Sequence, residues 1–284
     1  MNDVRHRVCV QGDCDRFFAR PDSRLQPGIV RYRAFRLTRG VPQQRLFVPS
    51  GQVSLFITLD GELRAGTAGQ ESAAASTCTA AVYGPHIRPK VLGHAGSMEG
   101  VEICVLPWAA YTLFGASMGD LADTMVDAST VLGPRIRHLA EALSEAPGWP
   151  DRFTILDQTL LRWTARAAAS REPAPPVLRA WDLLTRTAGT IPIRELAAST
   201  DWSQRQLEIR FRDQIGLSPK RLARVLRLNR SILMLSKGSS QTEAAITCGF
   251  YDQAHLTREF KALTGMPPGR FLTALAPGCS WPTT

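Results

Sequence analysis

The stretch of sequence that decides the fold covers residues 193–271, IRELAASTDWSQRQLEIRFRDQIGLSPKRLARVLRLNRSILMLSKGSSQTEAAITCGFYDQAHLTREFKALTGMPPGRF. Its second half repeats its first half at an offset of 49 residues, so that Leu207 returns as Leu256. The further matches at this offset are Ser203-Gln204 with Asp252-Gln253, Phe211 with Phe260, Arg212 with Lys261, Gly216 with Gly265, and Pro219 with Pro268.

Each copy predicts the same local structure. A short helix is expected over 193–199 and again over 243–247, followed by a turn of a few residues. Ser203 or Asp252 then caps a second helix by accepting a hydrogen bond from its first free amides. Gly216 or Gly265 ends that helix, because glycine readily adopts the left-handed conformation found after a helix. The stretch therefore predicts two helix-turn-helix motifs.

The outward side of each second helix is cationic. If Leu207 and Phe211 are buried, the helical period places polar side chains on the opposite side. These outward positions are Arg205, Ile209 and Arg212 in the first copy and Ala254, Arg258 and Lys261 in the second. A helical solenoid or a plain bundle is the alternative, but a solvated helix face more often mixes both signs of charge.

The net charge of +9 is concentrated after residue 170. Residues 1–170 hold 18 Lys and Arg against 16 Asp and Glu, a net of +2, whereas residues 171–284 hold 16 against 9, a net of +7. A compact basic segment attracts polyanions, and nucleic acid is the commonest partner of this kind.

The stretches LAASTDWSQRQLEIRFRDQIGLSPKRLARVLRLNRS and CGFYDQAHLTREFKALTGMPPGRF resemble the DNA-binding domain of AraC/XylS-type transcription regulators. The GF…L…FK…G…P pattern of the second motif is the specific part of this resemblance. It implies an all-α domain in which a long helix, here residues 219–235, joins two helix-turn-helix units. It also implies a sequence-specific DNA-binding transcription regulator whose two recognition helices enter adjacent major grooves.

Carried over residue by residue, the resemblance assigns DNA-binding side chains to both recognition helices. The family commonly has Arg where this chain has Ile209, which can only pack against a thymine methyl group. Either the first motif reads DNA differently or the second carries more of the specificity. His255 has the alternative of a surface histidine without a functional role. The predicted DNA-binding residues are Ser203, Gln204, Arg205, Glu208, Ile209 and Arg212 in the first motif and Gln253, Ala254, His255, Arg258 and Lys261 in the second.

The earlier part of the chain predicts strands and then helices. Residues 47–59 form an apolar run followed by the turn signal Asp60-Gly61, which predicts a hairpin. A further strand is expected over 100–106, and helices over 109–114, 121–126, 136–144 and 152–169. The runs VPSGQVSLFITLDG and YGPHIRP resemble the N-terminal domain of one subset of these regulators, which implies a small β-barrel that binds an effector, dimerises, or does both.

The predicted fold class is therefore α+β, with an N-terminal small β-barrel or cupin-like domain with helices and a C-terminal all-α tandem helix-turn-helix domain. The proline-rich segment 171–177 is expected to be a linker. It separates an N-terminal effector-binding or dimerisation domain, residues 1–170, from the DNA-binding domain, residues 178–284. In both helix-turn-helix turns, Trp202 and Phe250 are expected to pack in the core.

Several other classes of protein are disfavoured. The longest uncharged run, residues 103–119, is 17 residues long and is broken by Pro107 and Gly115, too short and irregular to span a membrane. The first residues lack the apolar run of a secretory signal, so we expect a cytoplasmic, nucleoid-associated protein. The six cysteines show no metal-binding spacing, and His86, His94 and Glu99 lack the His-x-His pair of a metal cupin. No metal, cofactor or catalytic residue is predicted.

The expected partners are double-stranded operator DNA, RNA polymerase, a small-molecule effector and a second copy of the chain. Two alternatives stay open. A DNA-repair methyl acceptor of the adaptive-response type carries a similar DNA-binding module, although it needs clustered cysteines ahead of the helices. A ligand-binding barrel with enzymatic activity and an incidental DNA module is the other.

Overall fold

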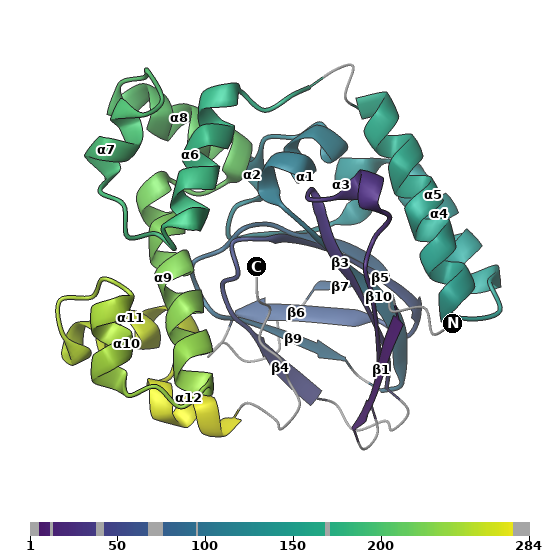
Figure 1. The fold of residues 1–284 in the computed structure, drawn as a ribbon. Coiled ribbons are helices and arrows are strands. Elements are labelled where there is room, and N and C mark those ends of the chain that lie inside the picture. The colour runs from purple at the N-terminus through teal and green to yellow at the C-terminus, as the bar shows by residue number, and fades with distance from the viewer. Residues whose placement is uncertain are drawn as a thin grey trace.

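The computed structural model describes residues 6–11, 14–37, 43–67, 76–94, 96–167 and 171–274. Strands dominate the first part of the chain and helices the last part (Figure 1). The strands are β1 (His6–Gln11), β2 (Cys14–Ala19), β3 (Ile29–Leu37), β4 (Gln43–Phe47), β5 (Val53–Asp60), β6 (Leu63–Thr67), β7 (Ser76–Cys78), β8 (Ala80–Tyr83), β9 (Lys90–His94), β10 (Met98–Val105) and β11 (Met125–Asp127). The helices are the 3-10 turn Ser23–Leu25, α1 (Pro107–Phe114), α2 (Met118–Leu121), α3 (Ala128–Leu132), α4 (Arg135–Glu145), α5 (Trp149–Ala167), α6 (Pro175–Arg186), α7 (Ile193–Ala198), α8 (Gln204–Ile215), α9 (Pro219–Ser236), α10 (Gln241–Thr247), α11 (Gln253–Thr264) and α12 (Pro268–Ala274).

The strands form two antiparallel sheets. One has the order β1-β2-β3-β10-β5-β8-β11, and the other has the order β4-β9-β6-β7. Phe56 and Tyr83 of the larger sheet pack with Leu63 and Phe47 of the smaller one. No strand pairing among the described residues joins the two sheets. The α+β fold class is confirmed, with two facing sheets in place of a closed barrel.

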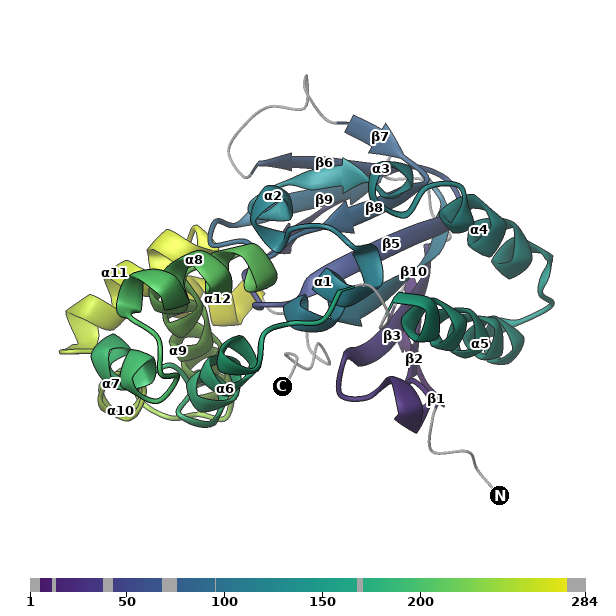
Figure 2. The same cartoon turned by 90° about the horizontal axis from the view of Figure 1, so that it is seen from above.

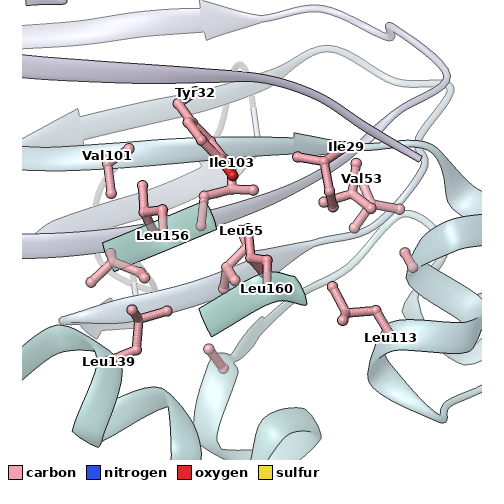
Figure 3. Close-up of a cluster of buried hydrophobic side chains, with 14 of the residues drawn as sticks. Ile29, Tyr32, Val53, Leu55, Val101, Ile103, Leu113, Leu139, Leu156 and Leu160 are labelled. Atoms are coloured by element: carbon pink, nitrogen blue, oxygen red, sulfur yellow. The ribbon is translucent and has the colours of Figure 1, made fainter. Parts of the chain in front are cut away.

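The main core lies on the other face of the larger sheet. Alternate residues of β3, β5 and β10 point into it, as the period of two along a strand requires. Leu156 and Leu160 of α5, Leu139 of α4 and Leu113 of α1 cover them (Figure 3). Seen from above, α4 and α5 lie along this sheet while α6 to α12 gather at the opposite end of the molecule (Figure 2).

Three predictions for the earlier part of the chain are wrong in detail. The turn Asp60-Gly61 does not close a hairpin, because β5 pairs with β10 and β8 whereas β6 pairs with β9 and β7. It carries the chain from one sheet to the other. The apolar run 47–59 is broken between β4 and β5 at residues 48–52, and the helix expected over 121–126 ends at Leu121, after which β11 extends the larger sheet.

The C-terminal helices form two cores that share α9. Leu222 and Val225 of α9 pack with Leu207 and Phe211 of α8. Further along α9, Leu228, Ile232 and Leu235 join the core that contains Leu256 and Phe260 of α11. A single 18-residue helix therefore connects the two units, as the resemblance implied.

Candidate nucleic-acid interface

Helix α8 begins where the sequence predicts. The Ser203 hydroxyl accepts a hydrogen bond from the Gln206 amide at 3.2 Å, and the Gln206 side chain accepts one from the Ser203 amide at 3.1 Å, which makes a complete capping box. The helix ends at Gly216, whose φ of 86° is the left-handed conformation that glycine adopts readily. Local sequence thus defines both ends of the first candidate recognition helix.

The outward side of α8 carries the residues predicted from the repeat. Gln204, Arg205, Glu208 and Arg212 are all exposed. Ile209 is 58% exposed, which is unusual for a large apolar side chain and leaves it free for an apolar contact. Glu208 and Arg212 form an ion pair at 3.1 Å on this exposed surface. Ser203 is exposed as well, but its hydroxyl is engaged in the cap.

Helix α11 is capped at its start and ended by a glycine, as α8 is. The Asp252 carboxylate accepts a hydrogen bond from the His255 amide at 2.6 Å and caps the helix. Gly265, with φ of 81°, ends it. Gln253, Ala254, Arg258 and Lys261 are exposed on the outward side, and His255 is half-buried. The second copy therefore presents its predicted residues in the same manner as the first.

Two of the predicted residues in the second motif have contacts that the sequence did not indicate. The Gln253 amide donates to Gln241 Oε1 at 3.3 Å, and the Thr242 hydroxyl donates to Gln253 Oε1 at 3.3 Å. The Nδ1 atom of His255 accepts a hydrogen bond from the Tyr251 amide at 3.3 Å, and its ring lies edge-on to Phe250. His255 thus braces the turn, and the start of α10 positions Gln253.

Two arginines of α9, Arg224 and Arg227, have structural partners. Arg224 donates to Glu259 of α11 at 2.7 Å. Arg227 donates to the Gly249 carbonyl at 3.1 Å and lies over the Phe250 ring. These contacts hold α10 and α11 to the connecting helix. By contrast, no ion pair of Arg205, Arg258 or Lys261 is found within the described ranges, so these three cations face solvent without a carboxylate partner.

The turn residues behave as expected. Trp202 is half-buried against the first core, and Phe250 is buried in the second. Tyr251, the residue after Phe250, is 92% exposed. Sequence reasoning did not single it out, although it immediately precedes the Asp252 cap.

Both helix-turn-helix units contact the strand-rich part of the chain. In the first unit, Asp213 of α8 is close to three groups: its carbonyl accepts from Ser117 Oγ at 3.3 Å, and its carboxylate lies 3.4 Å from the Tyr111 hydroxyl and 3.9 Å from Arg171. In the connecting helix, Asn229 Nδ2 donates to the Ser50 carbonyl at 3.2 Å. Helix α8 and the connecting helix α9 are therefore both held against the strand-rich part, where Ile87 packs against the cores of both units.

A buried polar group lies on the face of the larger sheet that meets the smaller one. The Glu102 carboxylate is buried, pairs with Arg33 and accepts a hydrogen bond from Ser54 Oγ at 2.6 Å. Burial alone would raise the pKa of Glu102, but the Arg33 guanidinium and the Ser54 hydroxyl lower it below its ordinary value. The carboxylate is therefore ionised at neutral pH and ties three strands together.

The residues considered for a metal cupin do not form a metal-binding set in the part of the chain that the structure describes. His86 is buried with its ring 5.2 Å from that of Phe47, and burial lowers its pKa to about 4. Glu99 pairs with Arg36 at 2.9 Å and with Arg152 at 2.6 Å. The His94 side chain lies outside the described residues.

The described cysteines have the character of protonated thiols. Burial raises the pKa of Cys104 to about 11 and also raises the pKa values of Cys78 and Cys248. A thiol needs a lowered pKa to act as a nucleophile near neutral pH, so these three do not resemble reactive methyl acceptors. The side chains of Cys9 and Cys14, and Cys279 as a whole, lie outside the described residues. Across the ranges that the structure describes, no helix combines the length and the apolar character needed to span a lipid bilayer.

Two family models match the chain. Residues 196–274 match a helix-turn-helix domain, and residues 18–127 match a domain of unknown function, DUF6597. The transcriptional regulator MtrA of Neisseria gonorrhoeae is 34% identical over 80 residues, which are 28% of this chain and 27% of MtrA. The regulator GbdR of Pseudomonas aeruginosa is 37% identical over 79 residues, 28% of this chain and 22% of GbdR.

The chain thus spans about a quarter of the length of these curated relatives. Among solved structures, ToxT of Vibrio cholerae aligns with 87% of this chain and 98% of its own, at 10% identity and a TM-score of 0.48. The helix-turn-helix family match falls on the two capped motifs described above. Residues 196–274 therefore form a helix-turn-helix domain of the AraC/XylS type.

Proposed function

We propose that this protein is a sequence-specific DNA-binding transcription regulator. The observation that carries the proposal is the pair of capped helices, α8 and α11, each with a buried apolar side and an exposed cationic outward side. Of these outward cations, Arg205, Arg258 and Lys261 have no ion pair within the described part of the chain. Arg205 lies in the first turn of α8, where a recognition helix contacts base edges, and Arg258 lies on the outward side of α11, halfway along it. An arginine can bind the O6 and N7 atoms of guanine through two hydrogen bonds.

The proposed DNA contacts divide by role. Gln204, Arg205, Ile209, Gln253, Ala254 and Arg258 face base edges, and Lys261 faces phosphates. Arg212 and Glu208 share an ion pair and form the edge of the first contact surface. Ser203 and His255 act by shaping the ends of their helices.

The proposed domain division follows the same reasoning. Residues 1–170 form the regulatory domain, 171–177 the connection, and 178–284 the DNA-binding domain. Helix α6 begins at Pro175, inside this connection, which leaves a short link between the parts. A small-molecule effector or a second copy of the chain would act on residues 1–170, and RNA polymerase would be the partner at the promoter. Such a protein acts at the nucleoid in the cytoplasm, as a binding protein and not as an enzyme.

The contacts at Asp213 and Ser50 support a regulatory role for residues 1–170. Asp213 lies on the first recognition helix, and Asn229, which binds the Ser50 carbonyl, lies on the helix between the two motifs. A change in the strand-rich part would therefore alter how the two motifs are placed relative to each other. An effector shifts such an equilibrium by binding one arrangement more tightly than the other.

Selection of genomic DNA fragments by the full chain tests the proposal. We expect enrichment of one sequence pattern with two recognition segments about one helical turn apart. The selection is repeated with and without a small-molecule extract of cells, and an effector would change the enrichment. Recovery of fragments without a shared pattern would contradict sequence-specific binding. The zinc content of the same preparation tests the alternative of a DNA-repair methyl acceptor, which requires bound zinc.

A further inference from the structure

Tyr251 is the most exposed of the large apolar residues that the structure leaves uncovered, at 92%. It stands in the turn between α10 and α11, directly before the Asp252 cap. An aromatic ring in water adds nothing to the free energy of folding, because it buries no apolar surface. Its exposure leaves both the ring and the hydroxyl accessible to a partner outside the folded chain.

The internal repeat explains how this exposure arises. At the offset of 49 residues, Tyr251 corresponds to Trp202. Trp202 packs against the first core, whereas in the second motif the buried aromatic is Phe250, one residue earlier. The left-handed residue of the turn also differs, being Asp201 in the first motif and Gly249 in the second. In the second turn the buried aromatic therefore comes one residue earlier, at Phe250, and the next side chain, Tyr251, is exposed.

The surroundings of Tyr251 hold it at the start of α11. Its amide donates to His255 Nδ1 at 3.3 Å, and the neighbouring Asp252 carboxylate caps the helix. The next residue along the chain is Gln253, whose amide is positioned by Gln241 and Thr242. Tyr251 therefore has a fixed backbone position next to the first residues of the candidate recognition helix.

We propose that Tyr251 is a DNA-backbone contact of the second motif, in which the phenol hydroxyl donates to a phosphate oxygen at the edge of the groove entered by α11. The proposal rests on the proposed function. The first residues of a recognition helix reach base edges in the groove, so the residue just before them lies at the rim, where the phosphates are. Tyrosine side chains are among the groups that bind DNA phosphates and sugars and fix the register of a protein on the duplex.

The test uses the full chain and a duplex recovered by the selection described above, with a duplex of scrambled sequence beside it. Tyr251→Ala is expected to weaken binding to both duplexes by about tenfold, because a backbone contact does not depend on sequence. The ratio of the two affinities is then unchanged. Tyr251→Phe, which lacks only the hydroxyl, is expected to lose most of the same affinity. Ile246→Ala removes another exposed apolar side chain, 72% exposed on α10, and is the matched control with wild-type binding.

A neutral methylphosphonate is then placed at each phosphate of the half read by α11. At one of these positions the methylphosphonate should weaken DNA binding by the wild-type protein and leave binding by Tyr251→Phe unchanged. Wild-type affinity of Tyr251→Ala would overturn the inference, as would a loss confined to the selected duplex. Normal DNA binding by Tyr251→Ala together with lost transcription would overturn it too, since the partner would then be a protein. If no sequence pattern is selected at all, the proposed function fails and not this contact alone.

Discussion

Arg258 is the residue whose position gives the sharpest expectation for base reading. It is exposed on α11 and corresponds to Ile209 of α8 in the repeat, so the second motif holds an arginine where the first holds an apolar side chain. We predict that Arg258→Ala costs about 1–3 kcal/mol of binding free energy on the selected duplex and relaxes the preference at one base pair. Binding titrations on duplexes with each base changed in turn measure both effects.

Arg137→Ala is the matched control for Arg258, because Arg137 is an exposed arginine on α4, in the other part of the chain. It should bind the duplex with wild-type affinity and preference. An Arg258→Ala protein that keeps its base preference at every position would remove Arg258 from the base-reading set.

The buried Glu102 gives a prediction on stability and pH. Glu102→Gln removes the buried carboxylate that pairs with the partly solvated Arg33. We expect the free energy of unfolding at neutral pH to fall by about 2–3 kcal/mol. Because the pKa of Glu102 is lowered by folding, its contribution is present above the ordinary value of 4.5 and is lost as pH falls through the lowered value. Urea unfolding followed by tryptophan fluorescence should show the gap between wild type and variant narrowing below about pH 4.

Glu62 is an exposed carboxylate at the turn after β5 and supplies the control. Glu62→Gln should shift the urea midpoint within the small range usual for surface changes. If Glu102→Gln proves as stable as wild type at neutral pH, the carboxylate does not tie the strands together.

At the scale of elements, the contact between α2 and α8 depends on Gly216. A methyl group at this position would lie 2.7 Å from the Met118 carbonyl oxygen, in a backbone with φ of 86°. We predict that Gly216→Ala destabilises the protein by clearly more than the roughly 1–2 kcal/mol that a left-handed backbone costs an alanine. Thermal unfolding with a calorimeter measures the change.

A substitution at Gly238 separates the cost of the contact with Met118 from the cost of the left-handed backbone. Its φ is 93°, but a methyl group added there would have no atom within 4 Å. Gly238→Ala should therefore show the backbone cost alone. Equal losses in the two variants would mean that α2 and α8 do not press on each other.

The sequence predicted the helix-turn-helix elements well because their ends are decided locally. Ser203 and Asp252 cap the helices that follow them, and Gly216 and Gly265 end those helices. These signals act within a few residues, and the repeat presented them twice. The outward cationic stripes followed from helical periodicity alone, and the structure exposes the residues that were expected there.

What the sequence could not predict depends on contacts between distant segments. An Asp-Gly turn suits a hairpin or a crossing between sheets equally well, and the partner strands of β5 and β6 decide which one forms. The exposure of Tyr251 arises because Phe250, one residue earlier, fills the core of the second turn. The contact of Ser117 with Asp213 joins residues 96 positions apart, and no local pattern indicates it.

At the scale of the whole molecule, basic residues concentrate in the part that holds both motifs. We predict that the affinity for the selected duplex falls about a thousandfold between 50 and 200 mM salt, as for proteins that contact six or more phosphates. Lys261→Ala should reduce the slope of log affinity against log salt by about one and leave base preference unchanged. A slope near zero would contradict a phosphate-dominated interface.

The predictions on DNA binding all assume that both motifs of one chain bind the same duplex. Residues 1–170 contact α8 at Asp213 and α9 at Asn229, so they hold the motifs in a defined arrangement. A chain with two recognition helices on one α9 scaffold can protect two neighbouring groove segments without a second copy. This arrangement predicts that each motif protects one of the two groove segments.

Hydroxyl-radical footprinting of the full chain on the selected duplex tests this most directly. We predict two protected segments about ten base pairs apart on one face of the DNA. Arg205→Ala should weaken protection of one segment, and Arg258→Ala should weaken protection of the other. A single protected segment, or the loss of both from either substitution alone, would contradict the account.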